Sequence, residues 1–544
     1  MRKNVHVCAL MTVLVASAAR AALAASQQEE RPGDGQVDAT TSGRPKELMP
    51  LVVVGFHADE KKDSRDAWIP TAVEETLAWR LRRVPGLTVT PTTRAHQARR
   101  ELAENGGDSP AEWSRVARLL GAERWLKGRC AGTPDALALS LELIRVGCPD
   151  AEAARIRLGP GRLFGVIDEA TRWTLSRLGI TRIGKKAEEL VFAPPSASPS
   201  ALEYYAKGLS AARRDDLRDG AYYVEQAIEY DPGFCPALML MTKIELRSSG
   251  ATRARAGGRL RRIKQLAADR GDALTEAEFE RIQGLLLLMR RSFDAARQRF
   301  ESALATAFER DDLYGQIAAM NSLCDLWLNY EPSTRGELSA DALRRLNEQN
   351  LRRAAEWQAL VLDMLRELGD VIAEVPAANK LALIYERLDE SLLALEAHKQ
   401  TVAAARETGS RRSEATGWLF LGQWYQRRER WREALEATSR CLALATDEAK
   451  PRVRIALAEV YRGMSLPREA LGQYELAYEA LASGDDLLNQ FRCLRAAADL
   501  RMELGDRGGA IKGLAEALDI AQVLGLAEAA TVRERLAQWR SEKP

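Results

Sequence analysis

The strongest constraint on the fold is a pair of small residues, glycine or alanine, that recurs beyond residue 200 with its members always 12 positions apart. A small residue on one helix that faces a small residue on the next allows the two helices to pack closely. Larger apolar residues three or four positions away fill the space beside that contact. The spacing therefore predicts a stack of paired helices. The six pairs are Gly208/Gly220, Gly284/Ala296, Ala382/Ala394, Gly422/Ala434, Ala458/Ala470 and Ala498/Ala510.

The clearest unit has the motif W-x-x-L-G-x-x-Y over residues 418–425, followed by Ala434, and it resembles the tetratricopeptide repeat. That repeat has a nominal period of about 34 residues. From Ala394 to Ala510 the second small residue advances by 40, 36 and 40 positions, which indicates longer connecting loops. The resemblance implies a right-handed α-α superhelical solenoid over residues 201–544.

Two parts of this predicted array depart from the pattern. Residues 235–270 and 311–370 have helical spacing but lack the paired small residues, and whether they are true repeats stays open. At the end of the chain, the apolar spacing of Leu526–Trp539 predicts a final amphipathic helix. Such a helix would cap the stack, because an uncapped last repeat exposes apolar surface.

Residues 49–192 predict a small mixed α/β sheet domain, so the whole chain is α+β and mostly α. Leu51–Phe56 is a continuous apolar run, typical of a strand buried on both faces. Leucine alternates with polar residues or alanine from Leu137 to Leu143, typical of an antiparallel strand with one solvated face. The order β-α-β-α-α-β-β-β-α indicates a sheet covered by helices. Residue ranges are assigned to strands 51–56, 87–90, 124–130, 137–143 and 153–158 and to three of the four helices, 69–84, 109–120 and 163–178.

Four segments of this region, in the same order, resemble the TolB-amino-terminal-like domain: Leu51–Phe56, Val84–Val89, Leu120–Gly128 and Leu139–Ile144. The first strand departs from the usual Leu-Pro-Phe ending, because this chain has Val-Gly-Phe there. In bacteria such a domain often precedes tetratricopeptide repeats, in regulators and in cyclase- or kinase-associated proteins. These domains are not known for catalysis, so the resemblance implies a binding or assembly module.

The first 25 residues predict a targeting signal and not a folded element. Residues 1–25 combine an initial positive charge, an apolar stretch and an A-x-A site, which is typical of a cleaved secretory signal. Residues 26–48 are polar and rich in Gly, Pro and Thr, which predicts a flexible leader, and the Pro/Ser stretch 193–200 predicts a hinge. We therefore expect export to the periplasm. The alternative is a cytoplasmic protein whose amino terminus only imitates a signal. No later stretch is long and apolar enough to predict a transmembrane helix.

Composition argues against most kinds of enzyme and against nucleic acid as a partner. Lys+Arg number 79 and Asp+Glu 77, so no bulk charge attracts phosphate, and four histidines leave little material for a metal site. Gly179–Lys185 is a near match to a phosphate-binding loop, but Lys186 replaces the Ser or Thr that binds magnesium, and a helix precedes the motif. We expect no cofactor, no metal and no catalytic residue, with Gly184 and Lys185 left as the candidates for a nucleotide-dependent enzyme.

The cysteines predict free thiols. Cys324 and Cys441 lie at small-residue positions of the repeats, and Cys493 lies near the start of another repeat helix; cysteine acts there as a small apolar side chain. Cys130 and Cys148 stand at opposite ends of adjoining predicted strands, roughly 30 Å apart at about 3.3 Å per residue. That separation is beyond disulfide reach.

The remaining candidate site is the inner groove of the array, which the first helix of each pair lines in such stacks. Arginine outnumbers acid at the groove positions, and its planar fork suits carboxylates on a peptide. The alternative is an ordinary solvated helix face held by pairs four residues apart. The groove positions are Asn379, Glu386, Arg387, Gln423, Gln426, Arg427, Arg452, Glu459, Arg462, Arg492, Arg495 and Asp499.

The sequence thus predicts an exported, non-enzymatic scaffold or adaptor that binds protein or peptide partners in the groove of its repeats. One alternative is a cytoplasmic signalling or transcription-associated regulator of the same architecture. The other is a nucleotide-dependent enzyme, for which a thermal shift with ATP and magnesium would be the test.

Overall fold

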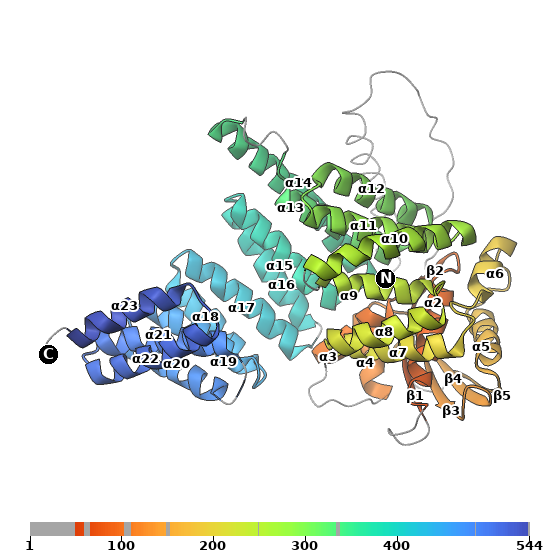
Figure 1. The fold of residues 1–544 in the computed structure, drawn as a ribbon, viewed down its shortest axis with the longest axis horizontal. Coiled ribbons are helices and arrows are strands. Elements are labelled where there is room, and N and C mark those ends of the chain that lie inside the picture. Colours follow the sequence, from red (N-terminus) through yellow and green to blue (C-terminus); the bar gives the residue numbers. More distant parts are fainter. Residues whose placement is uncertain are drawn as a thin grey trace. The chain divides into compact units, whose positions relative to one another are not determined.

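The structure is a computed structural model, and it describes residues 49–58, 66–102, 110–147, 153–247, 250–332, 338–407, 409–482, 484 and 486–541. The predicted signal, the predicted leader, the first residue of the predicted helix 109–120 and Cys148 lie outside these residues. The chain forms two compact units, Met1–Ala377 and Ala378–Pro544, and each is described by itself. The helix pairs that follow the sheet begin in the first unit and continue in the second (Figure 1).

The first unit begins with a five-stranded mixed sheet. β1 pairs in parallel with β2 and β3, and the β3–β4 and β4–β5 pairs are antiparallel. The strand order β2-β1-β3-β4-β5 places β1 between two neighbours. Leu51–Phe56 of β1 are buried, as their continuous apolar run predicted. The mixed sheet and the predicted element order are both confirmed. The strands are β1 (Met49–Ala58), β2 (Leu87–Val89), β3 (Arg124–Ala131), β4 (Leu137–Arg145) and β5 (Ala154–Gly161).

Helices cover both faces of this sheet because successive side chains of a strand point to opposite faces. Leu51 and Val53 of β1 belong to the core that also contains Val73 and Leu77 of α2. The alternate residues of β1 belong to a second core with Trp113 of α4. The helices of this part are α2 (Ile69–Leu81), α3 (Thr92–Leu102), α4 (Pro110–Leu119), α5 (Leu163–Arg177) and α6 (Lys185–Phe192).

Four helix pairs follow in the same unit, and the apolar core beneath α2 and α5 continues into them through Leu202 of α7 and Val224 of α8. In the preceding Pro/Ser stretch, Ser196 is buried and donates to an Asp231 carboxylate oxygen at 2.6 Å. The domain boundaries drawn from the sequence, including the hinge, stay predictions. The pairs are α7/α8 (Pro199–Arg213, Leu217–Tyr230), α9/α10 (Cys235–Arg247, Gly250–Arg270), α11/α12 (Ala273–Met289, Phe293–Glu309) and α13/α14 (Leu313–Asn329, Ala340–Leu368).

The second unit continues with the same kind of helix pair. Its first helix, α15, starts in the first unit and crosses the boundary at Ala378. Val532 and Leu536 of the last helix pack on Leu514, so this helix covers the apolar end of the stack as predicted. The helices are α15 (Val371–Arg387), α16 (Ser391–Glu407), α17 (Arg411–Arg427), α18 (Trp431–Leu444), α19 (Lys450–Gly463), α20 (Pro467–Leu481), α21 (Leu487–Glu503), α22 (Arg507–Val523) and α23 (Glu528–Ser541).

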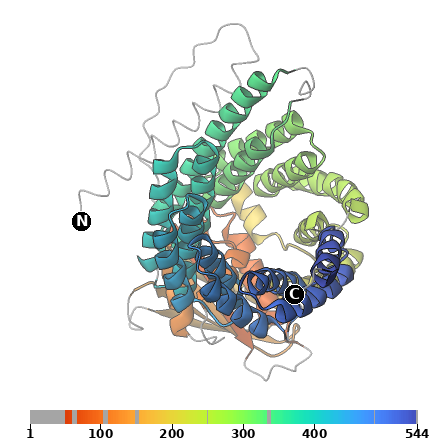
Figure 2. The ribbon, with the colours of Figure 1, turned by 90° about the vertical axis from the view of Figure 1, so that its left-hand side faces the viewer.

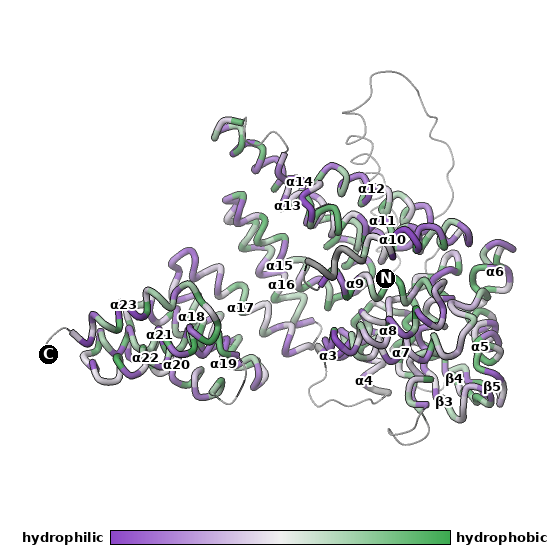
Figure 3. The backbone as a smooth tube through the Cα atoms, in the orientation of Figure 1, coloured by the Kyte–Doolittle hydropathy of each residue, from purple (hydrophilic) through white to green (hydrophobic). Residues whose placement is uncertain are grey.

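The small residues act at the contact within each pair. A Cβ on Gly208 would lie 2.6 Å from Val224 Cγ2, and one on Gly422 would lie 2.7 Å from Thr438 Oγ1. In both pairs, the side chain closest to the added Cβ therefore belongs to the residue 16 positions later in the sequence. The small residue 12 positions later is buried and lies one turn before that residue on the second helix. Both segments that depart from the sequence pattern, 235–270 and 311–370, also form helix pairs. The array is thus a tetratricopeptide-like solenoid built of amphipathic helices. Figure 2 shows these helices in a second view, and hydrophilic and hydrophobic positions alternate along them in Figure 3.

Candidate functional site

In the first unit, the inner face of the helix pairs contacts the α/β domain. The residues that approach α2 and the chain after β2 come from the first helices of the pairs, α7, α9, α11 and α13. This assignment of the inner face to first helices is the one that the sequence predicted. Here the face is occupied by the protein's own α2.

Three arginines of the α/β domain reach three aspartates at the starts of first helices. Arg82 Nη2 lies 3.3 Å from Asp312 Oδ2, before α13. Arg83 Nη2 lies 2.5 Å from Asp272 Oδ2, before α11. Arg94 donates to both carboxylate oxygens of Asp370, before α15, at 2.7 and 3.0 Å. Asp272 and Asp370 also accept a backbone N–H of the helix that they begin, from Thr275 and Ala373, so each both caps a helix and docks the α/β domain. Asp312 makes no such capping bond and contributes only the contact with Arg82.

The Arg83–Asp272 pair is the most buried of the three, since each side chain is only 5% exposed. Asp272 also accepts from the backbone N–H of Thr275 and from its hydroxyl, at 3.4 and 2.7 Å. Burial alone would raise the pKa of Asp272, but Arg83 and Thr275 hold that pKa below its usual value. The Arg83 guanidinium in turn stacks on the Trp79 ring, 3.3 Å from its centroid. Both charges are therefore compensated inside the contact.

Acidic residues of α2 make the reverse contact with α7. Arg213, at the end of α7, forms an ion pair with Glu75 and lies 3.6 Å from the Glu74 carboxylate. Glu74 is 3% exposed and lies 2.6 Å from His96 Nε2. Burial alone would raise the pKa of Glu74, but His96 and Arg213 lower it. Both acidic and basic side chains therefore connect α2 and the residues at its end to the array.

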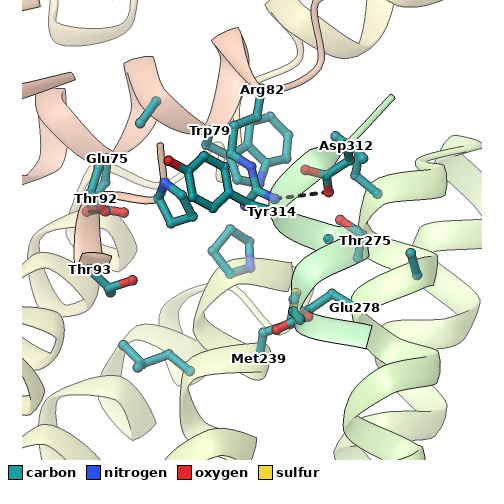
Figure 4. A pocket seen from close by; sticks show the side chains of 18 of the residues that line it. Glu75, Trp79, Arg82, Thr92, Thr93, Met239, Thr275, Glu278, Asp312 and Tyr314 are labelled. Carbon is teal, nitrogen blue, oxygen red and sulfur yellow. Dashed lines mark hydrogen bonds and ion pairs between the residues drawn. The ribbon is translucent and has the colours of Figure 1, made fainter. Parts of the chain in front are cut away.

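A pocket of about 380 Å³ lies between α2 and the first helices. Figure 4 shows Trp79 and Arg82 of α2 beside Tyr314 of α13, with Thr92 and Glu75 on one side and Thr275 and Glu278 on the other. Arg82 makes its ion pair with Asp312 at the edge of this space. Its size is within the range of small-molecule sites, which starts at about 300 Å³.

In the second unit, several predicted groove residues bond to the next first helix. Arg427 of α17 donates to both carboxylate oxygens of Glu386 of α15, at 2.9 and 2.8 Å. Gln426 of α17 donates to Glu459 of α19 at 3.2 Å. The same face continues with the ion pairs Arg452–Asp486 at 3.3 Å and Asp499–Arg535 at 2.7 Å. These bonds connect α15, α17, α19, α21 and α23 in succession, and we call them the polar ladder.

The other predicted groove residues lie in three settings. Asn379 is buried, at 8% exposure. Arg462 is exposed and donates to the Tyr474 hydroxyl, and Arg495 lies over the Phe491 ring at 5.4 Å. A further group is at least partly open to solvent: Arg387, Gln423 and Arg492.

Gly184 and Lys185, the candidates for a nucleotide site, do not lie in the structural setting of a phosphate-binding loop. Gly184 precedes α6, and helix α5, not a strand, comes before the Gly179 turn. Lys185 is exposed on the first turn of α6. Among the described residues, no group of three His, Cys, Asp or Glu side chains is arranged to hold a metal ion. In the same part of the chain, no helix combines the length and apolarity needed to span a bilayer.

The described cysteines are all buried: Cys130, Cys235, Cys324, Cys441 and Cys493. Burial raises the pKa of the Cys235 thiol to about 11 and those of Cys441 and Cys493 to about 12. A thiol must ionise to act as a nucleophile, so these side chains are poor candidates for chemistry.

Comparison with known proteins gives only distant fold likeness. No family model and no curated protein matches the sequence. Among solved structures, BtubC from P. vanneervenii is 18% identical, with 44% of this chain and 91% of that chain covered and a TM-score of 0.34. A signal transduction ATPase from Pyrococcus horikoshii with a tetratricopeptide repeat sensor is 13% identical, with 66% and 56% covered and a TM-score of 0.43. The quorum sensor NprR from B. thuringiensis is 11% identical, with 62% and 98% covered and a TM-score of 0.34. Such low values transfer no function.

The contact between α2 and the array was not predicted from the sequence. Its signals are present but local: adjacent arginines, Arg82 and Arg83, at the end of one helix, and aspartates directly before others. An aspartate there predicts a helix start and says nothing about a distant arginine. The contact joins residues 189 positions apart in the case of Arg83 and Asp272.

Proposed function

We propose that the protein is an exported, non-enzymatic scaffold that binds an acidic protein segment on the first-helix face of α15–α23. The α/β domain would be a TolB-amino-terminal-like assembly module, and residues 1–25 would direct export to the periplasm. The observation that carries the proposal is the occupation of the first-helix face by α2 in the first unit. That contact is an example, within this chain, of a helix docked on this kind of face through arginine–carboxylate pairs.

The second unit has the charges for the reverse arrangement. In the first unit three aspartates of the repeats bind arginines of the docked domain, while Arg213 of α7 makes the opposite contact with Glu75 of α2. In the second unit the first helices carry exposed arginines at positions 387, 452, 462 and 492. Guanidinium groups bind carboxylates through paired hydrogen bonds, so acidic side chains on the partner fit this face.

The polar ladder fixes the spacing of the first helices and so prepares the surface before a partner arrives. A surface that is already ordered loses less conformational entropy on binding than one that must be assembled. Arg427 and Arg452 of this face already form ion pairs in the polar ladder. We therefore assign the partner contact to Arg462 and Arg492, which are exposed, and not to Glu386 and Arg427, which bind each other.

A library of random 16-residue peptides selected on the full-length protein tests the proposal. We expect the enriched peptides to be acidic and to bind at least ten times more weakly to the double variant Arg462→Glu/Arg492→Glu. The matched control is Arg468→Glu, an exposed arginine on the second helix α20. Enrichment without a charge preference, or an equal loss in the control, would contradict the proposal. An amino-terminal fusion to a phosphatase that is active only outside the cytoplasm tests export.

A further inference from the structure

The pocket beside α2 is built from two parts of the chain that are distant in sequence. Ala78, Trp79 and Arg82 of α2 and Pro91–Thr93 form one wall. Residues of the first helices α7, α9, α11 and α13 form the other walls. The pocket is therefore present only when the α/β domain is docked on the array. A molecule that fills it would contact both parts at once.

The middle of the pocket is apolar and partly aromatic. Trp79, Pro236, Met239, Leu240 and Tyr314 are among the residues that line it. Small residues on the surrounding helices leave the space open where larger side chains would close it: Ala78, Ala277, Gly315 and Ala318. Ring-shaped or branched apolar groups fit such walls, because flat aromatic side chains stack on them and aliphatic ones contact their edges.

Most cations at the pocket wall already have a carboxylate of their own. Arg82 is paired with Asp312 and Arg83 with Asp272. Glu75 forms an ion pair with Arg213, which also lies 3.6 Å from the Glu74 carboxylate. These groups fix the walls and contribute no excess positive charge for an anionic ligand.

One cluster differs, because two cations share a single carboxylate. Lys243 Nζ lies 2.8 Å from Glu278 Oε1, and Arg281 donates to both oxygens of the same carboxylate at 2.8 Å. Burial would raise the pKa of Glu278, but Arg281 and Lys243 hold it far below its usual range, so the carboxylate stays ionised. The cluster therefore carries one excess positive charge at the wall of an apolar pocket.

We propose that this pocket binds a small organic anion with an apolar, ring-sized body, whose acidic group lies at Lys243 and Arg281 and whose body lies between Trp79, Tyr314 and Pro236. This site is separate from the proposed partner surface on α15–α23. Because the ligand would contact both α2 and the first helices, binding strengthens the docked arrangement of the α/β domain. Any ligand that binds only the docked state stabilises that state in proportion to its free concentration and affinity.

Two fluorescent probes with the same rings test both parts of the proposal on the full-length protein. The anionic probe is 8-anilinonaphthalene-1-sulfonate, and the uncharged probe is N-phenyl-1-naphthylamine. We expect saturable one-to-one binding of both, with the anion at least ten times tighter. In Lys243→Met, binding of the anion should fall about tenfold while binding of the neutral probe stays within twofold. The matched control is Lys207→Met on α7, which lies outside the pocket wall and should change neither.

A second variant tests the location by filling the space. Ala318→Phe should abolish binding of both probes, with the folded state checked by circular dichroism. Lys243 is 47% exposed, so its variant keeps the test valid if Ala318→Phe fails to fold. Unsaturable binding, equal affinity for the two probes, or anion binding unchanged in Lys243→Met would overturn the proposal. Partner selection on α15–α23 is measured separately, so either proposal can fail alone.

Discussion

The first four helix pairs and the last four are all pairs of adjoining amphipathic helices, but their inner faces meet different neighbours. In the first unit, first helices contact α2 of the same chain, and the Arg83–Asp272 pair is only 5% exposed on each side. In the second unit, the polar ladder lies closer to solvent, with Arg452 at 72% and Asp486 at 31% exposure. The same helix face can therefore dock a domain or stay accessible. Burial decides how much each ion pair contributes.

The largest expected difference between the two regions comes from breaking the buried pair. Arg83→Met leaves Asp272 buried without its partner, which should lower the free energy of unfolding of the first unit by about 3–5 kcal/mol. Arg83→Met/Asp272→Asn should recover most of this loss, because no charge stays buried and the amide can still cap α11. Urea denaturation followed by circular dichroism measures both.

The matched change in the second unit is Arg428→Met, whose partner Asp389 is 87% exposed. An exposed pair contributes at most about 1 kcal/mol, and we expect a change near the lower end of that range. If both single variants shift the unfolding midpoint equally, burial does not distinguish the two regions.

A second comparison uses two glycines in different settings. A Cβ at Gly121 would lie 1.4 Å from the Leu368 carbonyl oxygen, and the residue has a φ of +67°. Gly121→Ala should therefore cost more than about 2 kcal/mol, from the left-handed backbone and from the clash between the α/β domain and α14. In α20 of the second unit, nothing lies within 4 Å of a Cβ at Gly472.

Gly472→Ala should accordingly stabilise the second unit, by up to about 1 kcal/mol, because alanine favours a helix interior. Thermal unfolding of both variants measures the opposite signs. Destabilisation by Gly472→Ala, or tolerance of Gly121→Ala, would contradict the packing described for each site.

The smallest expected effect concerns the polar ladder. Burial would raise the pKa of Glu386, but His398 and Arg427 lower it. A lowered pKa stabilises the fold above the unfolded value of about 4.3, and this contribution is lost as the pH falls through the folded value. Glu386→Gln should therefore cost about 1 kcal/mol or less at pH 7 and progressively less in acid. Denaturation at pH 7 and pH 3 measures the difference.

The control for this variant is Glu407→Gln, an exposed glutamate on the second helix α16. It should change stability by a few tenths of a kcal/mol at most and show no comparable dependence on pH. An effect of Glu386→Gln that grows in acid would show that the carboxylate is not stabilised by its two neighbours.

The sequence by itself determined the mixed sheet, the paired helices and the closing helix, because these depend on spacings within a few turns or one strand. The 12-residue spacing identified six pairs, and Leu51–Phe56 identified a strand buried on both faces. Two further pairs, α9/α10 and α13/α14, lack the small residues, and only the packing of their helices in the structure identified them as pairs. Of the groove residues, the sequence placed Arg462 and Arg492 on exposed helix positions but did not show that Glu386 and Arg427 bind each other.

Only the tertiary structure decided which residues meet across long separations. Helical periodicity shows that an aspartate begins α11, but the path of the array determines that Arg83 reaches it. The same holds for the pocket, whose excess charge depends on Lys243 and Arg281 meeting Glu278 beside α2. The physical reason is that hydrophobic spacing is repeated in every helix, while an ion pair depends on one distance between two particular atoms. Local pattern therefore fixes the elements, and packing assigns their partners.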